Sequence, residues 1–183
     1  MLRLMIVHSI TPATYAGARA IRDHVHATVG VSPRIRDDLV KSYGFDPQWT
    51  FAIANGTSLA GHLPMARPLS RHEPLRLLSL GRIEDIAKGV FWLPMILGAL
   101  PAAVTLTIAG TGPDAARLKT LCAPFGTRVR FAGEAGPAEV DALMTSHDVL
   151  LAPSRFEGFM ITAVEAMARG CVPVIAQIRG VTD

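Results

Sequence analysis

A pair of cations in the middle of the chain could hold a diphosphate. Arg82 follows an apolar run that ends at Leu80, and Lys88 comes six residues after Arg82. Arginine binds phosphate through a planar fork of N–H donors, lysine binds it as a point charge, and the free N–H groups of a helix start add to both. Taken alone, the pair is also consistent with two solvated surface cations.

Two glutamates farther along could bind hydroxyl groups. Glu157 stands in the segment P-S-R-F-E-G-F that begins at Pro153, and Glu165 follows eight residues later. Eight residues of helix rise about 12 Å, so the two carboxylates cannot act as acid and base on one atom. They could hold the two ends of an extended ligand, because an ionised carboxylate accepts hydrogen bonds from sugar and ribose hydroxyls. An exposed helix charge is the common alternative for either glutamate alone.

A glycine motif suggests a nucleotide or a tight turn. The segment Gly110–Ala115 matches the G-x-G-x-x-A dinucleotide fingerprint, with Glu134 at the end of the next predicted strand. A strand-to-helix turn with Pro113 at the first helical position explains the same residues. The sequence has no D-x-D or G-x-S-x-G motif, and only His24 and His26 have a spacing near that of metal ligands. We therefore expect no resident metal ion or cofactor.

Composition excludes several classes of protein. Of the 183 residues, 50% are hydrophobic and 18% charged, which excludes a disordered chain. The net charge is +3 with scattered Lys and Arg, and 6% aromatic residues do not suggest nucleic-acid binding. The only cysteines, Cys122 and Cys171, favour a reducing cytosol over a disulfide scaffold. The uncharged stretch Gly89–Pro113 imitates a membrane span, but its prolines favour a buried helix followed by a buried strand.

Apolar runs alternate with helical segments along the chain. This alternation predicts an α/β fold, a Rossmann-like parallel sheet with helices on both faces, whose ligands bind at the carboxyl ends of the strands. The predicted strands are Leu4–Val7, Ala27–Val31, Thr50–Ala54, Leu75–Leu80, Val104–Ala109, Arg128–Ala132, Val149–Ala152 and Val172–Ala176. The predicted helices are Ala16–His24, Arg34–Tyr43 (with Ser32 as N-cap and Pro33 as the first helical residue), Val90–Leu100, Asp114–Cys122, Ala138–Ser146 and Ile161–Arg169.

The motifs together resemble the retaining GT-B glycosyltransferases of family 4, the group 1 transferases. The resemblance rests on the order of Gly81-Arg82, Lys88-Gly89, G-T-G-P at Gly110–Pro113, P-S-R-F-E-G-F at Pro153–Phe159, E-A-M-A-R-G at Glu165–Gly170, V-G-V-S at Val29–Ser32 and A-N-G at Ala54–Gly56. It implies an incomplete GT-B fold. Residues 1–56 would be a remnant of the N-terminal acceptor-side domain, 57–73 a linker, and 74–183 the C-terminal donor domain without its last strand and helix.

The resemblance also implies roles for individual residues. Arg82 and Lys88 would hold the donor diphosphate, Glu157 the donor sugar and Glu165 the ribose, and His8 would lie beside the donor sugar. The remaining donor-binding residues would be Gly81, Gly110, Gly112 and Ser154, with the backbone N–H groups of Phe159, Met160 and Ile161. Met160 departs from the E-G-F-G pattern of the family, and its side chain would narrow the donor pocket.

The implied reaction moves a sugar from a nucleoside diphosphate sugar to an acceptor, with retention of configuration and no metal ion. Its catalytic residues would be Glu157, Arg82, Lys88 and His8. The acceptor would be a saccharide, a lipid or a polyprenyl carrier. We expect a cytoplasmic location, or a peripheral one at the inner membrane face, and self-association through exposed edges.

Two other functions stay open. One is a non-catalytic nucleotide-sugar-binding fragment or remnant. The other is a nicotinamide-dinucleotide domain built on Gly110–Ala115 and Glu134, although this function does not explain Arg82, Lys88 and the two glutamates together.

Overall fold

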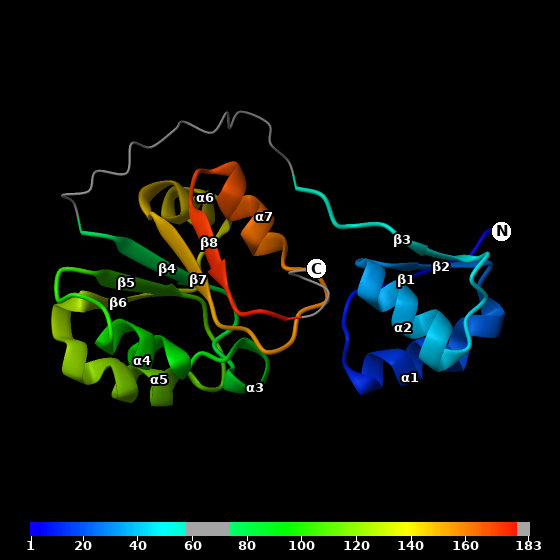
Figure 1. The fold of residues 1–183 in the computed structure, drawn as a ribbon, viewed down its shortest axis with the longest axis horizontal. Coiled ribbons are helices and arrows are strands. Elements are labelled where there is room, and N and C mark those ends of the chain that lie inside the picture. Colours follow the sequence, from blue (N-terminus) through cyan, green and yellow to red (C-terminus); the bar gives the residue numbers. More distant parts are fainter. Residues whose placement is uncertain (58–73, 179–183) are drawn as a thin grey trace. The chain divides into compact units, whose positions relative to one another are not determined.

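The structure, a computed structural model, describes residues 1–57 and 74–178 (Figure 1). The chain divides into two compact units. The first unit gathers residues 1–56, the segment Phe156–Ile161 and the described residues from Gln177. The second unit gathers the described residues of Thr57–Arg155 together with Thr162–Ala176. The predicted linker, apart from residue 57, lies outside the described residues.

The first unit contains a three-stranded parallel sheet in the order β1-β2-β3. Two helices, α1 and α2, cover one face of this sheet (Figure 1). The buried side chains between them include Val7, Ile35 and Leu39. The elements are β1 (Leu4–Val7), α1 (Pro12–Ile21), a 3₁₀ turn (Arg22–His24), β2 (Ala27–Gly30), α2 (Pro33–Tyr43) and β3 (Thr50–Ala52).

Local capping residues set the starts of both α-helices in the first unit. The Ser32 hydroxyl accepts the N–H of Ile35 at 3.3 Å, and Pro33 is the first residue of α2, which confirms that helix start. The prediction that the first helix begins at Ala16 was wrong. It begins at Pro12, because the Thr11 side chain accepts the N–H of Thr14 and Pro12 fits the first helical position.

The second unit contains a five-stranded parallel sheet in the order β6-β5-β4-β7-β8. Helices α4 and α5 lie on one face of the sheet, and α6 and α7 lie on the other (Figure 1). This confirms the Rossmann-like arrangement. The elements are β4 (Arg76–Leu80), α3 (Asp85–Lys88), α4 (Trp92–Gly98), β5 (Thr105–Ala109), α5 (Ala115–Cys122), a 3₁₀ segment (Ala123–Arg128), β6 (Val129–Gly133), α6 (Pro137–Ser146), β7 (Val149–Ala152), α7 (Ile161–Ala168) and β8 (Val172–Ile175).

Adjacent residues of β4 enter two separate cores. Leu77 packs with Leu93, Leu97 and Leu118 of α4 and α5. Its neighbour Leu78 packs with buried residues of α6 and α7. Because successive side chains of a strand point to opposite faces, this split is what a sheet covered on both sides requires.

The helix predicted at Val90–Leu100 is α4 (Trp92–Gly98), which is two residues shorter at each end. The sequence analysis missed the short helix α3 before it, which is separated from α4 by Gly89 at φ 60°. Gly89 ends α3 in the left-handed region, and a Cβ atom there would lie 2.2 Å from the Pro153 carbonyl oxygen, so both the backbone conformation and the packing favour glycine. Among the described residues, no helix is long and apolar enough to cross a bilayer.

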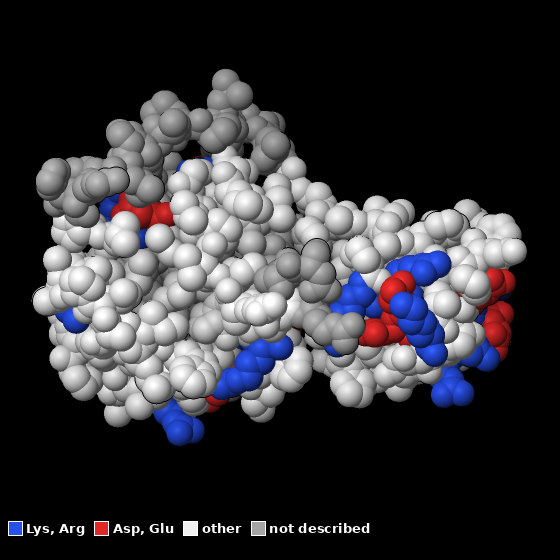
Figure 2. Space-filling model, in the orientation of Figure 1, with Lys and Arg blue, Asp and Glu red and all other residues white. Residues whose placement is uncertain are grey.

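One face of the first sheet is apolar and exposed. Ile6, Val29 and Phe51 lie in one row across the three strands, since Ile6 pairs with Val29 and Val29 with Phe51. Ile6 is 57% exposed and Phe51 45%. The self-association that we expect through open edges stays a prediction. In the view of Figure 2, charges of both signs are interspersed, and neither unit shows a broad patch of one sign.

A buried histidine joins α6 to β5. His147 Nδ1 lies 2.7 Å from the Leu143 carbonyl oxygen and therefore donates to it, and Nε2 accepts from the Thr107 hydroxyl at 2.8 Å. Burial lowers the pKa of His147, and the charges of Arg130 and Arg76 add to this effect. The fold therefore favours the neutral imidazole.

Acid should destabilise the second unit through this residue. The unfolded chain titrates its histidine near pH 6.5, above the lowered pKa of folded His147. The stability contributed by neutral His147 is therefore complete above about pH 6.5 and is lost as the pH falls below it, at no more than about 1.4 kcal/mol per pH unit. Urea unfolding at several pH values should show this slope, and His147→Gln should remove it. An unchanged slope in the variant would assign the acid sensitivity to other groups.

Candidate functional site

The loops after β4 and β5 pack against each other at the carboxyl edge of the second sheet. The Ile83 N–H donates to the Thr111 carbonyl at 2.8 Å, and the Gly81 N–H to the Ala109 carbonyl at 3.0 Å. A Cβ atom at Gly110 would lie 1.9 Å from the Gly81 carbonyl oxygen, and Gly110 has a φ of +132°. Both facts require glycine at position 110. The paired loops form one hydrogen-bonded rim at the strand ends.

A cavity of about 380 Å³ opens at this rim. It lies where ligands of parallel α/β sheets bind, outside the carboxyl ends of the strands. The Arg82 side chain is 66% exposed, and its Nε lies 3.9 Å from a Glu84 carboxylate oxygen, which is too long for a hydrogen bond. A phosphate could therefore compete for this guanidinium. The cavity is lined by Leu80, Gly81, Arg82, Ala109, Gly110, Thr111, Glu134, Ala135 and Val140.

The second predicted cation, Lys88, is the last residue of α3. The sequence predicted Lys88 just ahead of a helix that starts at Val90, and in the structure that helix, α4, starts at Trp92. Three charged residues that sequence reasoning did not assign, Asp85, Asp114 and Arg155, hydrogen-bond around α3. The sequence carried only a weak signal for two of them. Arg155 lies inside the P-S-R-F-E-G-F segment, and Asp114 directly follows the glycine turn.

The remaining predicted residues of the second unit lie after β7 and on α7. Ser154 follows β7 and is buried. Glu165 lies in the middle of α7 and is half-buried, and its backbone carbonyl accepts from the Arg169 guanidinium at 3.0 Å. The second unit thus carries the cavity with Gly81, Arg82 and Gly110, and also Gly112, Lys88, Ser154 and Glu165.

The first unit carries the other predicted residues. His8 directly follows β1 and is exposed. Glu157, Phe159, Met160 and Ile161 belong to the segment that groups with this unit. Phe159 packs against the core of the unit, and Met160 is buried, with 5% of its surface exposed.

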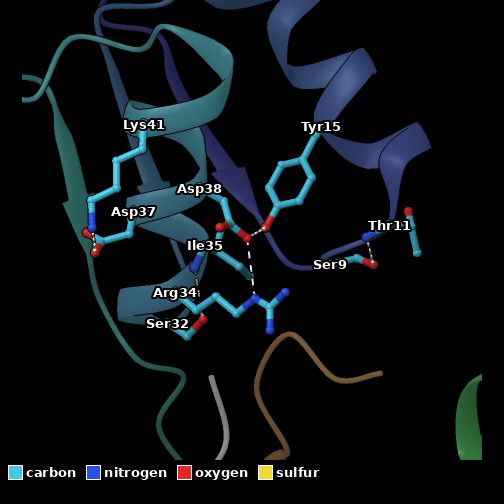
Figure 3. Close-up of polar contacts among 9 residues, drawn as sticks. All are labelled: Ser9, Thr11, Tyr15, Ser32, Arg34, Ile35, Asp37, Asp38 and Lys41. Carbon is cyan, nitrogen blue, oxygen red and sulfur yellow. Dashed lines mark hydrogen bonds and ion pairs between the residues drawn. The ribbon is translucent and has the colours of Figure 1, made fainter. Parts of the chain in front are cut away.

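A polar cluster that sequence reasoning missed joins α1 to α2 in the first unit (Figure 3). The Tyr15 hydroxyl donates to an Asp38 carboxylate oxygen at 2.8 Å, and Arg34 Nε lies 3.3 Å from the same oxygen. Burial, followed by the hydrogen bond to Asp38, raises the pKa of Tyr15, so its hydroxyl stays protonated. The tyrosine ring also stacks on Tyr43, with 4.6 Å between centroids. Among the described residues, no cluster of three or more His, Cys, Asp or Glu side chains could hold a metal ion.

Comparisons with known proteins identify the family. A family model described as glycosyl transferases group 1 matches residues 74–183. Glycogen synthase of Mycobacterium tuberculosis is 30% identical over 161 residues, which are 83% of this chain and 37% of that protein.

Solved structures agree with this match. The lipopolysaccharide outer core galactosyltransferase WaaB is 25% identical with a TM-score of 0.71, over 86% of this chain and 44% of WaaB. HepE of Anabaena, solved with UDP-glucose, is 21% identical with a TM-score of 0.80, over 97% of this chain and 54% of HepE. The chain thus spans about a third to a half of the length of these proteins. Together with the strand-end cavity and the order of the motifs, the family model and these relatives show that the chain belongs to the group 1 glycosyltransferases.

Proposed function

We propose that the complete protein transfers a sugar from a nucleoside diphosphate sugar to an acceptor with retention of configuration, and that this chain carries the donor site. One observation carries the proposal: Arg82 lines a cavity at the carboxyl ends of β4 and β5. The UDP-glucose bound to HepE, a protein of the same fold, supports a uridine nucleotide as the first donor to test.

Sugar transfer requires positive charge at the position where the nucleoside diphosphate leaves. Arg82 and Lys88 supply it as fixed cations, which stabilise the developing charge more in the transition state than in the bound donor. The absence of a D-x-D motif supports a reaction without a metal ion. Glu165 would hold the ribose, and Glu157 and His8 would act on the sugar. Analysis of the anomeric product by NMR tests the retention of configuration.

The acceptor and the location are part of the same proposal. TarM of S. aureus, a protein of the same fold, was solved in complex with alpha-GlcNAc-glycerol and UDP. The presence of a sugar conjugate together with UDP in that complex supports a saccharide over a lipid or polyprenyl carrier as the acceptor here. Both cysteines are buried thiols, which supports a reducing, cytoplasmic location.

The packing of the glycine loop weighs against a nicotinamide-dinucleotide site. Gly110 and Gly112 lack side chains at positions where a Cβ atom would meet the Gly81 and Ile83 carbonyl oxygens. The glycines therefore make room for the neighbouring loop. In addition, the Asp114 carboxylate lies immediately before the start of α5, where it would repel a pyrophosphate.

Calorimetry separates these functions. We expect this chain to bind UDP, GDP or ADP more tightly than NAD, because the terminal phosphate of a nucleoside diphosphate offers Arg82 and Lys88 more negative charge than the pyrophosphate diester of NAD does. Uridine serves as the control for binding without phosphate. Tighter binding of NAD, weakened by Glu134→Gln, would contradict the proposal and support the dinucleotide function. Binding of a nucleotide sugar without its consumption, in the presence of the complete protein and an acceptor, would favour a non-catalytic binding role.

A further inference from the structure

We propose that Arg155, Asp85 and Asp114 are positioning residues that fix α3, and with it Lys88, for the donor diphosphate. The inference rests on the proposed function and deepens it, because it names the residues through which a third strand-end loop acts on phosphate binding. None of the three needs to touch the donor.

Helix α3 is too short to be stable without contacts to other elements. It has four residues, Asp85–Lys88, and a single helical turn is unstable in water because nucleation is costly. Gly89 ends it in the left-handed region at φ 60°. The position of Lys88 must therefore come from contacts with other elements.

The loop after β5 supplies the first contact. Asp114 accepts the Asp85 N–H at 2.7 Å, which satisfies a donor that α3 leaves unpaired in its first turn. Asp85 in turn accepts the Phe91 N–H at 2.9 Å through its Oδ1 atom. This bond closes the turn through which the chain leaves α3.

The loop after β7 supplies the second contact. The Arg155 guanidinium donates to Asp85 Oδ2 at 3.0 Å and also to the Asp85 carbonyl oxygen. The backbone N–H of Arg155 donates to the Ala87 carbonyl at 2.8 Å. Close packing of Gly89 against the Pro153 carbonyl completes this side. Three loops, after β4, β5 and β7, therefore meet at one short helix.

The charges of Asp85, Arg155 and Lys88 also affect where the Lys88 ammonium lies. Asp85 and Lys88 are three residues apart on one helix, a spacing at which opposite charges attract each other. Both carboxylate oxygens of Asp85 are engaged, by Phe91 and by Arg155. Loss of Arg155 would free one oxygen to draw the Lys88 ammonium away from a phosphate.

A double-mutant cycle tests the inference with UDP as ligand. We expect Arg155→Ala to weaken UDP binding about five- to tenfold and to leave uridine binding unchanged. If Arg155 acts through Lys88, the same change in a Lys88→Ala background should cost less than about twofold. Arg155→Lys should restore part of the loss. Lys119→Ala removes another exposed cation of the second unit and serves as the control.

Two results of the cycle would overturn the inference. Additive losses in the double variant would show that Arg155 meets the diphosphate directly or acts elsewhere. Unchanged UDP affinity in Arg155→Ala, with thermal melting showing an intact fold, would show that the network does not position Lys88.

Hydrogen exchange in the ligand-free chain keeps this inference separate from the proposed function. We expect Arg155→Ala to speed exchange of the Lys88 and Phe91 amides, which donate to the Glu84 carbonyl and to Asp85. Asp114→Asn, whose side-chain oxygen can still accept, should speed exchange less than Asp114→Ala. If the wild-type chain binds no nucleoside diphosphate, the proposed function fails. Unchanged exchange in Arg155→Ala overturns the positioning network whether or not UDP binds.

Discussion

Gly110→Ala is expected to destabilise the second unit by about 3 kcal/mol or more and to abolish nucleotide binding. The added Cβ atom would lie 1.9 Å from the Gly81 carbonyl oxygen, and the backbone φ of +132° is one that side-chain-bearing residues rarely adopt. Neither the loop after β4 nor the loop after β5 can yield without breaking the hydrogen bonds that join them. Urea unfolding gives the free energy, and calorimetry with UDP gives the binding.

Two other glycines provide matched controls for this substitution. Gly126 also has a positive φ, of 52°, but nothing lies within 4 Å of its Cβ position. Gly126→Ala should therefore carry backbone strain alone. Gly17 lies in α1 with open space around it, and Gly17→Ala should leave stability unchanged or raise it by about 0.5–1 kcal/mol. If Gly110→Ala costs no more than Gly126→Ala, the two strand-end loops can separate freely.

The sheets could be predicted because their strands are continuous apolar runs. All eight predicted strands overlap β1–β8, and the Leu4–Val7 and Val149–Ala152 ranges match their strands. The parallel arrangement followed from the alternation with helices, since a covered parallel strand has no polar face to reveal. Helix starts depended on local signals: the Ser32-Pro33 pair was interpreted correctly, whereas the equivalent Thr11-Pro12 pair was overlooked.

The details around Lys88 depend on tertiary contacts that no local pattern reveals. Gly89, which ends α3, packs against the Pro153 carbonyl, more than sixty residues away in the chain. The contact of Asp85 with Arg155 likewise joins loops after different strands. Sequence order predicted which types of residue gather at the carboxyl edge, and only the structure shows which carboxylates hold loops together and which cations face a cavity.

Arg82→Ala and Lys88→Ala should each weaken binding of a nucleoside diphosphate by about 1–3 kcal/mol, or about 5- to 150-fold, the range of a charge-assisted hydrogen bond. Arg82 should give the larger loss with UDP, because it lines the cavity itself. Uridine affinity should change little in either variant, since the nucleoside carries no phosphate. The UDP affinity should also fall as salt is raised in the wild-type chain, and this dependence should diminish in both variants.

Comparing the affinity for UDP with the affinity for uridine in each variant shows whether the cation contacts a phosphate. A loss of uridine affinity equal to the loss of UDP affinity would mean that the substitution disturbed the cavity and not a phosphate contact. Arg82→Lys offers a conservative control, because it keeps the charge but loses the planar fork, and it should recover only part of the binding. Unchanged UDP affinity in Arg82→Ala and Lys88→Ala together would leave the two residues as ordinary surface cations, the alternative that their spacing alone allowed, and the donor site would have to lie elsewhere.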